Sequence, residues 1–398
     1  MFTMKRAPEA STTKTSPTMD TTSPAETPLR YVPGGDAEAL RRRLGLDRVI
    51  KLASNENPLG PPLASRDAIS RAAEDGHIYP ECGSESLRRA LADRHGLDEE
   101  EVLVTCGSTE AIHLVALSVA NATPGAGVIA PRESFIAYRI AAQQVGLRTI
   151  DVPLRDDRVD LSGLLAAIGP EVGVVFIANP NNPTGTAVDP TLLRRFLQRV
   201  PERVLVVLDE AYIEYLAPER RVDAAALVRK HKNLVVLRTF SKAYALAGLR
   251  VGYVLGAAAT ISRLARLTMP FRVSAAAQRA ALAALDDELF VARTQLHNRR
   301  QRAILSRGLL ALGADVTLSE TNFVLARFGE RTAELAASLR ERGIMVRTLD
   351  PYGISDGLRV SIGLAEDNQA LLRVLDKLLR GGVGSLSEAP TPGRIRAS

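Results

Sequence analysis

The sequence TFSKAYALAGLR, at residues 239–250, decides the fold. It follows the apolar run LVVL at 234–237 and precedes a second strand-like run at 251–255. Lys242 lies beside hydroxyl residues in the turn between these runs, and Arg250 follows eight positions later. A lysine and an arginine in such a turn indicate a bound anion beside an amine that acts as a nucleophile. The alternative is a solvated loop lysine.

The size and composition of the chain indicate a globular protein of two packed units. Its 398 residues exceed the usual size of one hydrophobic core. A hydrophobic content of 46% and a charged content of 24% are typical of soluble globular domains. Lysine is scarce, which favours a specific role for Lys242; the other lysines are Lys5, Lys14, Lys51, Lys230, Lys232 and Lys377.

The distribution of charge and cysteine argues against several classes of protein. The net charge of +6 is spread over 51 basic and 45 acidic residues without a basic block, so we expect no nucleic-acid partner. No uncharged apolar run is long enough to span a bilayer, so we expect no membrane association. Cys82 and Cys106 have neither CxxC nor Cys/His spacing, so we expect no metal site and no disulfide framework. The cytoplasm is the expected location.

Composition along the chain divides it into five segments. Residues 1–28 are rich in Thr, Ser, Pro and Ala and lack the apolar core of a secretory signal, so we expect a disordered tail. The next segments are an N-terminal arm at 29–60, a large domain at 61–265 and a small C-terminal domain at 266–381. Residues 382–398 are expected to form a loose tail.

Short apolar runs alternate with helical stretches in the large domain. The expected strands are 102–105, 127–130, 148–152, 172–178, 204–208, 234–237 and 251–255. The clearest expected helices are 109–120, 135–145 and 190–199. This alternation predicts a mostly parallel sheet covered by helices on both faces, with ligands bound beyond the carboxyl ends of its strands.

The pattern changes beyond residue 265 and predicts a smaller α+β domain. A long Ala/Leu/Arg-rich stretch at 275–312 is expected to be helical. The further elements expected are a helix at 332–342 and strands at 322–327, 344–347 and 358–362.

Two polar motifs directly follow expected strands. Gly107, Ser108 and Thr109 come after the run VLVT and begin a helix, where free backbone N–H groups and the helix dipole favour a phosphate. A plain helix N-cap is the alternative. The sequence NPNNPTG at 179–185 forms a rigid turn that presents three asparagines, either to a ligand or at the surface.

Asp209 ends the apolar run RVLVVLD, and Tyr212 follows three positions later. A carboxylate at the end of a buried strand is costly unless it is paired, so we expect Asp209 to face a cation. A helix-capping aspartate is the alternative. The Tyr212 hydroxyl is expected to point at the same ligand.

Two arginines lie within strand patterns of the small domain. Arg359, in LRVSIG, indicates bidentate recognition of a carboxylate. An edge-strand arginine that faces solvent is the competing interpretation. Arg347, in IMVR, has the same two interpretations.

These motifs, in this order, resemble fold type I pyridoxal-phosphate-dependent aminotransferases. The set consists of GST at 107–109, NPNNPTG, DEAY at 209–212, SKAYALAGLR and LRVSIG. LASNENPLG at 52–60 and YPECGSESLR at 79–88 are similar to motifs of the histidinol-phosphate aminotransferase branch. The resemblance covers about residues 29–380 and implies an α/β fold with a mostly parallel central sheet and a smaller α+β C-terminal domain.

The resemblance implies a role for each residue that matches a family motif. Lys242 matches the lysine that forms a Schiff base with the cofactor, pyridoxal 5'-phosphate, and moves the substrate proton. Asp209 matches the aspartate that keeps the pyridine nitrogen protonated. Tyr212 and Asn182 match the pair that binds the ring hydroxyl. Phe135 falls where the family stacks an aromatic ring on the cofactor.

Further matches concern the cofactor phosphate, the substrate and the oligomer. Tyr79 matches a tyrosine that reaches the phosphate from a neighbouring subunit, which implies a homodimer with shared active sites. Asn55 and Arg359 match contacts to the substrate carboxylate, and Tyr31 and Arg347 fall near contacts to the substrate phosphate. The residues that match the cofactor-phosphate site are Gly107, Ser108, Thr109, Thr239, Ser241 and Arg250.

The resemblance predicts the transamination of L-histidinol phosphate with 2-oxoglutarate, giving imidazole acetol phosphate and L-glutamate in histidine biosynthesis. An aromatic-amino-acid aminotransferase that acts on phenylalanine or tyrosine is the main alternative, because the motifs around the lysine are shared. A decarboxylase of a phosphorylated amino acid is another. A transcription regulator would need a DNA-binding module, and residues 1–28 contain no helix-turn-helix pattern.

Overall fold

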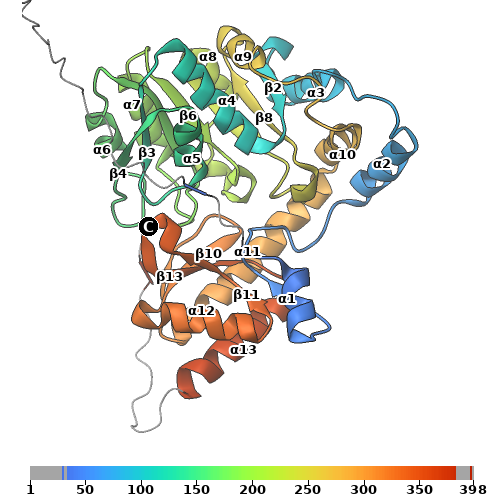
Figure 1. The fold of residues 1–398 in the computed structure, drawn as a ribbon, viewed down its shortest axis with the longest axis vertical. Coiled ribbons are helices and arrows are strands. Elements are labelled where there is room, and N and C mark those ends of the chain that lie inside the picture. Colours follow the sequence, from blue (N-terminus) through green and yellow to red (C-terminus); the bar gives the residue numbers. More distant parts are fainter. Residues whose placement is uncertain (1–28, 31–33, 382–394, 397–398) are drawn as a thin grey trace, which may run out of the picture.

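The computed structural model describes residues 29–30, 34–381 and 395–396. The tail expected at 1–28 lies outside these residues, as does all of the tail expected at 382–398 except its residues 395–396. The described chain forms two α/β units, one above the other in Figure 1, and the longest helix runs between them.

A seven-stranded sheet forms the centre of the large unit. Its strands lie in the order β2-β8-β7-β6-β5-β3-β4, and β8 runs antiparallel to both of its neighbours while the other pairs are parallel. The mostly parallel sheet expected from the sequence is confirmed. The strands are β2 Val102–Thr105, β3 Gly127–Pro131, β4 Arg148–Val152, β5 Val172–Ala178, β6 Leu205–Asp209, β7 Leu234–Thr239 and β8 Gly252–Gly256.

Both faces of this sheet are buried because its strands are apolar at successive positions. Val206 and Leu208 pack into one core, whereas Leu205 and Val207 pack into the other. Side chains alternate between the two faces of a strand, so a continuous apolar run requires cover on both sides. The first core also contains α3 Glu85–His95, α6 Leu161–Ala166, α7 Pro190–Arg199, α8 Ala224–Lys230 and α10 Ala275–Leu285. The second contains α4 Gly107–Ala122, α5 Ala137–Gln144 and α9 Ala258–Ala265.

The small unit is built on an antiparallel sheet in the order β12-β13-β10-β9, which β14 extends in parallel. A separate parallel pair joins β1 of the N-terminal arm to β11. The strands are β1 Ile50–Lys51, β9 Asp315–Thr317, β10 Phe323–Arg327, β11 Ile344–Met345, β12 Arg347–Leu349, β13 Ile354–Ser361 and β14 Ile395–Arg396. The helices of this part are α1 Ala37–Leu44, α12 Thr332–Glu341 and α13 Ala365–Gly381.

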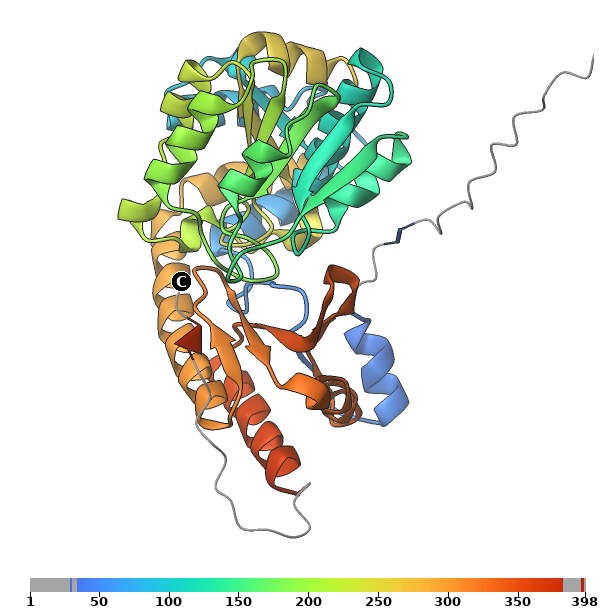
Figure 2. The same ribbon diagram turned by 90° about the vertical axis from the view of Figure 1, so that its left-hand side faces the viewer.

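The helix α11, Glu288–Ala311, connects the two units (Figure 2). Its 24 residues span about 36 Å at the usual rise per residue. The sequence predicts one helical region at 275–312, and this prediction is wrong at residues 286–287, which separate the end of α10 at Leu285 from the start of α11 at Glu288. Asp287 caps α11 by accepting a hydrogen bond from the N–H of Phe290 at 2.9 Å.

Packing assigns α10 to the large unit rather than to the small one. Ala277, Ala281 and Leu285 are buried in the same core as the large sheet, and α10 packs along α2, Leu63–Glu74. We propose that the domain boundary lies after Leu285. The limits expected from the sequence, with a division at residue 265, stay predictions.

Candidate active site

A cavity of about 490 Å³ opens where the carboxyl ends of the large-sheet strands meet the small unit. Parallel strands bring their carboxyl ends to one edge, so residues far apart in sequence meet there. Ser54, Glu56, His113, Tyr138 and Tyr352 line the cavity as well, although the sequence did not single them out. The predicted site residues that line it are Asn55, Ser108, Thr109, Phe135, Asn182, Asp209, Tyr212, Thr239, Ser241, Lys242, Arg250 and Arg359.

Lys242 follows β7 and points its amine into this cavity. Its Nζ donates to the backbone carbonyl oxygens of Ser54 and Asn55, each at 3.3 Å, and lies 5.6 Å from the centre of the Tyr212 ring. Burial, and then the positive charge of Arg359, lower the pKa of Lys242 to about 7. A large fraction of this amine is therefore neutral at neutral pH and available as a nucleophile or base.

Asp209 ends β6 and is almost completely buried, with 4% of its surface exposed. Its Oδ2 accepts a hydrogen bond from the Tyr138 hydroxyl at 2.8 Å, and its Oδ1 accepts the N–H of Ala211 at 3.1 Å. Burial raises the pKa of Asp209 to about 6, although both hydrogen bonds act in the opposite direction. A buried carboxylate that lines a cavity is suited to a cationic ligand group.

The first turn of α4 and the turn after β7 meet at the cavity and carry donors that suit an anion. The N-cap of α4 is Cys106, without a side-chain cap, so the N-cap role considered for Ser108 and Thr109 is wrong. The hydroxyl of Ser241 accepts from Nη1 of Arg250 at 3.1 Å and from Thr239 Oγ1 at 3.0 Å. Helix N-termini, hydroxyls and an arginine are the donors that bind phosphate esters.

Gly107 allows the arginine to approach this helix end. A Cβ atom at position 107 would lie 2.5 Å from Nη2 of Arg250, and the φ angle of +74° also disfavours other residues. Arg250 itself has a φ angle of 54°, in the left-handed region that few residues other than glycine adopt. The phosphate of the implied cofactor, pyridoxal phosphate, fits this set of donors.

Tyr212 and Asn55 form a second polar contact at the cavity wall. The side-chain amide of Asn55 donates to the Tyr212 hydroxyl at 3.0 Å, and the Ser361 hydroxyl donates to Asn55 Oδ1 at 3.0 Å. Burial raises the pKa of Tyr212, so this phenol stays protonated at neutral pH. Asn55 has a φ angle of 55°, a conformation that asparagine tolerates better than most residues.

Arg359 enters the cavity from β13, which lies between β12 and β10 and is not an edge strand. Its Nη1 donates to Asn182 Oδ1 at 2.5 Å, and its Nη2 donates to the carbonyl oxygen of Ala53 at 2.8 Å. Arg359 is only 4% exposed, so it does not face solvent. The alternative interpretation, an edge-strand arginine that faces solvent, is therefore wrong. A buried arginine at a cavity wall is suited to a carboxylate ligand.

Four predicted residues are not among those that line the cavity: Gly107, which lies behind the guanidinium of Arg250, and Tyr79, Arg347 and Tyr31. Tyr79 is 78% exposed and stacks on Phe271 with ring centres 4.7 Å apart. Arg347 is buried and lies opposite Arg359 on the neighbouring strand, but it does not line the cavity. Tyr31 lies outside the described residues.

Neither a metal site nor a membrane span is found among the described residues. Within residues 29–30, 34–381 and 395–396, no three His, Cys, Asp or Glu side chains are grouped as metal ligands would be. Every helix in that part of the chain is too short or too polar to cross a bilayer.

Comparison with known proteins agrees with this geometry. A family model described as aminotransferase class I and II matches residues 47–377. The chain belongs to this family. A histidinol-phosphate aminotransferase 2 from Ralstonia nicotianae is 42% identical to this aminotransferase over 354 residues, which cover 88% of this chain and 94% of the relative. A histidinol-phosphate aminotransferase 1 from Thiobacillus denitrificans is 44% identical over 356 residues, covering 89% and 92%.

A solved structure extends the comparison to three dimensions. The crystal structure of histidinol-phosphate aminotransferase from Sinorhizobium meliloti, in complex with pyridoxal-5'-phosphate, matches with a TM-score of 0.81 and 29% identity. The match covers 92% of this aminotransferase and 100% of that chain. The expected aminotransferase fold and enzyme class are confirmed.

Proposed function

We propose that this aminotransferase uses pyridoxal 5'-phosphate to transfer the amino group of L-histidinol phosphate to 2-oxoglutarate, giving imidazole acetol phosphate and L-glutamate. The observation that carries the proposal is the placement of Lys242, whose pKa is about 7, in one cavity with the buried Asp209 and an anion site. The names and the high coverage of the histidinol-phosphate relatives support the choice of substrate and a role in histidine biosynthesis.

The residues that would hold the cofactor surround the cavity. Asp209 would pair with a protonated ring nitrogen, and Tyr212 and Asn182 would donate to the ring hydroxyl. Phe135 lines the cavity beside Tyr138 and would stack on the ring. The phosphate would be bound by the first turn of α4, with Gly107, Ser108 and Thr109, and by Thr239, Ser241 and Arg250.

The chain itself supplies the base and the electrostatic environment. When bound, pyridoxal phosphate supplies an electron sink for negative charge that develops on the substrate carbon. Lys242 takes the proton from that carbon in its neutral form, which burial and Arg359 favour. Arg359 and Asn55 hold the carboxylate of the glutamate or 2-oxoglutarate partner, and Tyr31 and Arg347 are proposed contacts to the substrate phosphate.

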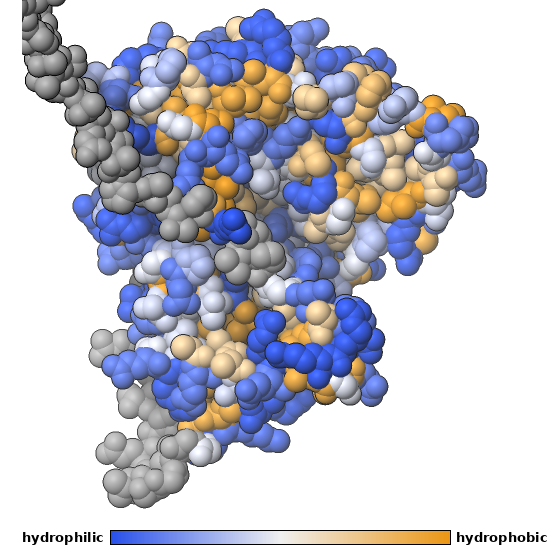
Figure 3. All heavy atoms as spheres, viewed as in Figure 1, coloured by the Kyte–Doolittle hydropathy of each residue, from blue (hydrophilic) through white to orange (hydrophobic). Residues whose placement is uncertain are grey.

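A homodimer with shared active sites is part of the proposal. Tyr79, Met269 and Phe271 are 78%, 73% and 42% exposed, although each is largely apolar. Figure 3 shows apolar surface over the part of the large unit that carries α2 in Figure 1. Burying such side chains against a second copy would stabilise the dimer and would bring Tyr79 toward the partner's cofactor phosphate.

The proposed location is the cytoplasm. Cys82 and Cys106 are both free thiols, as a reducing compartment permits.

A single-turnover experiment tests the substrate. The purified protein is loaded with pyridoxal phosphate, and L-histidinol phosphate or L-phenylalanine is added separately while the absorbance of the bound cofactor is followed. We expect histidinol phosphate to convert the cofactor at a concentration at least about tenfold lower than L-phenylalanine requires. A phosphate contact adds roughly 1.4 kcal/mol or more to the binding free energy. Preference for phenylalanine would instead identify an aromatic aminotransferase.

The variant Lys242→Ala is the matched control. It keeps the cavity and the anion site but removes the amine, so it should bind the cofactor without converting it. Conversion at the unsubstituted rate by this variant would contradict the role of Lys242.

A further inference from the structure

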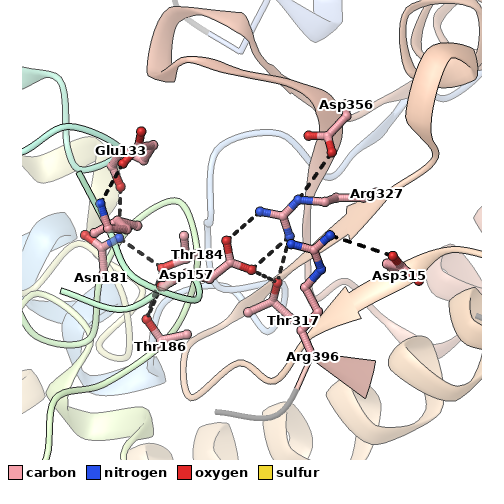
Figure 4. A network of polar contacts seen from close by, with 11 residues as sticks. Glu133, Asp157, Asn181, Thr184, Thr186, Asp315, Thr317, Arg327, Asp356 and Arg396 are labelled. Carbon is pink, nitrogen blue, oxygen red and sulfur yellow. Dashed lines mark hydrogen bonds and ion pairs between the residues drawn. The ribbon is translucent and has the colours of Figure 1, made fainter. Parts of the chain in front are cut away.

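A buried ion pair joins the two units at a distance from the cavity. Nη2 of Arg327, at the end of β10, lies 2.6 Å from Oδ1 of Asp157, and Nη1 donates to Oδ2 at 2.9 Å. Asp157 belongs to the connection between β4 and α6 of the large unit. Thr317 of β9 donates to the same Oδ2 at 2.8 Å, and Figure 4 shows all three side chains converging.

The pair is almost completely removed from water. The side chains of Arg327 and Asp157 are 9% and 10% exposed. Asp156 and Asp157 have φ angles of 51° and 62°, which are uncommon for residues other than glycine. Bidentate geometry and a third donor compensate a carboxylate for lost hydration, so the pair fixes both partners in one relative position.

On the large-unit side, Asp157 is connected to the turn that carries Asn182. Its backbone carbonyl oxygen accepts a hydrogen bond from Thr186 Oγ1 at 2.7 Å. Thr186 lies 3.1 Å from the hydroxyl of Thr184, which accepts from the side-chain amide of Asn181 at 2.9 Å (Figure 4). A continuous chain of hydrogen bonds therefore runs from Asp157 to the residue before Asn182.

On the small-unit side, Arg327 is connected to Arg359 by strand pairing. In the β10–β13 pair, Leu325 lies opposite Arg359 and Arg327 lies opposite Gly357. Arg327 therefore lies two residues after Leu325, the residue of β10 that pairs with Arg359. The two units meet at Asp157–Arg327 and again at Asn182–Arg359, where Nη1 donates to Oδ1 at 2.5 Å.

We propose that Asp157 and Arg327 are positioning residues for Arg359. The ion pair holds the sheet of the small unit against the turn at 179–186, so that the guanidinium of Arg359 lies at the depth where it binds a substrate carboxylate. The inference rests on the proposed function, because it takes Arg359 as the carboxylate contact.

The test compares carboxylate binding with cofactor binding in the loaded protein. The variants Asp157→Asn and Arg327→Lys each break the bidentate pair. The control Arg331→Gln breaks an ion pair with Glu334 on the same unit, where the two side chains are 35% and 59% exposed. The probe is maleate, a dicarboxylate without an amino group, and its dissociation constant is read from the absorbance of bound pyridoxal phosphate.

We expect about a tenfold weaker affinity for maleate in both variants, since small displacements of a binding group have effects of this size. The affinity for pyridoxal phosphate should change less than about twofold, and the control should match the unsubstituted protein in both. KM for L-glutamate should rise by the same factor as the maleate dissociation constant, because both ligands use Arg359.

Unchanged maleate affinity in folded variants would overturn the inference, as would an equal loss of cofactor affinity, which indicates general loosening. Absence of maleate binding by the unsubstituted protein would overturn the role of Arg359 and this inference with it. If the ion-pair variants do not fold, Thr317→Val decides, because it removes the hydroxyl that donates to Asp157 and accepts from Arg327 but leaves both charges in place. That variant should weaken maleate binding about threefold at unchanged cofactor affinity, and no change would overturn the inference.

Discussion

The hydroxyl of Tyr138 donates a hydrogen bond to Oδ2 of Asp209 at 2.8 Å. Tyr138 lies on α5 and its ring stacks on Phe176 of β5, so packing fixes the direction of the hydroxyl. Burial raises the pKa of Asp209 to about 6, and this hydrogen bond acts against that rise because it stabilises the ionised form. Tyr138 therefore helps to keep Asp209 ionised at neutral pH.

Replacing Tyr138 by Phe should lower activity most strongly in acid. Without the donor, the pKa of Asp209 rises further, so a larger fraction of the carboxylate is protonated and unable to pair with a cationic ring nitrogen. A hydrogen bond to a charged group contributes roughly 1.5 kcal/mol, which moves the acid limb of the profile up by about one pH unit. We therefore expect kcat/KM to fall about tenfold near pH 5 and only about twofold at neutral pH. A pH series of kcat/KM is the measurement. An acid limb at the same pH as in the unsubstituted enzyme would contradict the role of Tyr138.

The substitution Asp209→Asn should stabilise the cofactor-free protein at pH 8 but not at pH 4. The folded-state pKa of Asp209, about 6, lies above its ordinary value of 3.8, so the ionised carboxylate costs stability that grows from about pH 4 and is complete above pH 6. At pH 4 the folded protein holds the proton and the cost is nearly absent. We expect a gain of about 2 kcal/mol at pH 8, measured by urea unfolding. Loss of stability at pH 8 would mean that a cation pairs with Asp209 in the cofactor-free protein.

The sequence predicted the large unit well because its strands are unambiguous. Runs such as 172–178 are apolar at nearly every position and rich in valine and isoleucine, which is typical of a strand buried on both faces, and β5 has these same bounds. Asp209 and Lys242 follow such runs directly, so their meeting at one sheet edge follows from the topology.

Other features depend on packing that a local pattern does not encode. Tyr138 lies 71 positions before Asp209 and reads as an ordinary core aromatic of an amphipathic helix. The expected strand at 344–347 is split, because 344–345 pairs with the N-terminal arm while Arg347 begins a strand that pairs with β13.

The break between α10 and α11 had a local signal, since Asp286 and Asp287 interrupt an Ala/Leu-rich stretch and aspartate favours helix N-caps.

The reactivity of Lys242 should increase with pH up to about 7 and then level off. Only the neutral amine bonds to an aldehyde, and the lowered pKa of this lysine, about 7, sets the midpoint. We expect the rate of cofactor incorporation into the cofactor-free protein to rise about tenfold per pH unit below the midpoint. The same series with pyridoxal, which has no phosphate, separates the ionisation of the Lys242 amine from that of the cofactor phosphate.

The variant Arg359→Gln provides the control for this pH profile. Among the charged groups, Arg359 has the largest effect in lowering the pKa of Lys242. Its removal should therefore move the midpoint to higher pH. A midpoint that does not move would show that burial alone sets the reactivity of the lysine.

Gly107→Ala should weaken phosphate binding while the protein stays folded. A Cβ atom at position 107 would lie 2.5 Å from Nη2 of Arg250, so the guanidinium must move away from the anion site. Gly125→Ala is the matched control, because its φ angle of +77° is close to the +74° of Gly107 while its added Cβ meets nothing within 4 Å. Both variants should lose about 1 kcal/mol of stability from the left-handed backbone.

The dissociation constant of pyridoxal phosphate distinguishes the two glycine variants. We expect it to rise about tenfold or more in Gly107→Ala, since a displaced arginine loses a charge-assisted contact, and to change less than about twofold in Gly125→Ala. Pyridoxal, which lacks the phosphate, should bind both variants equally, because Asp209 and Lys242 are untouched. Equal affinity of the two variants for pyridoxal phosphate would mean that Arg250 binds the phosphate from a position that Gly107 does not control.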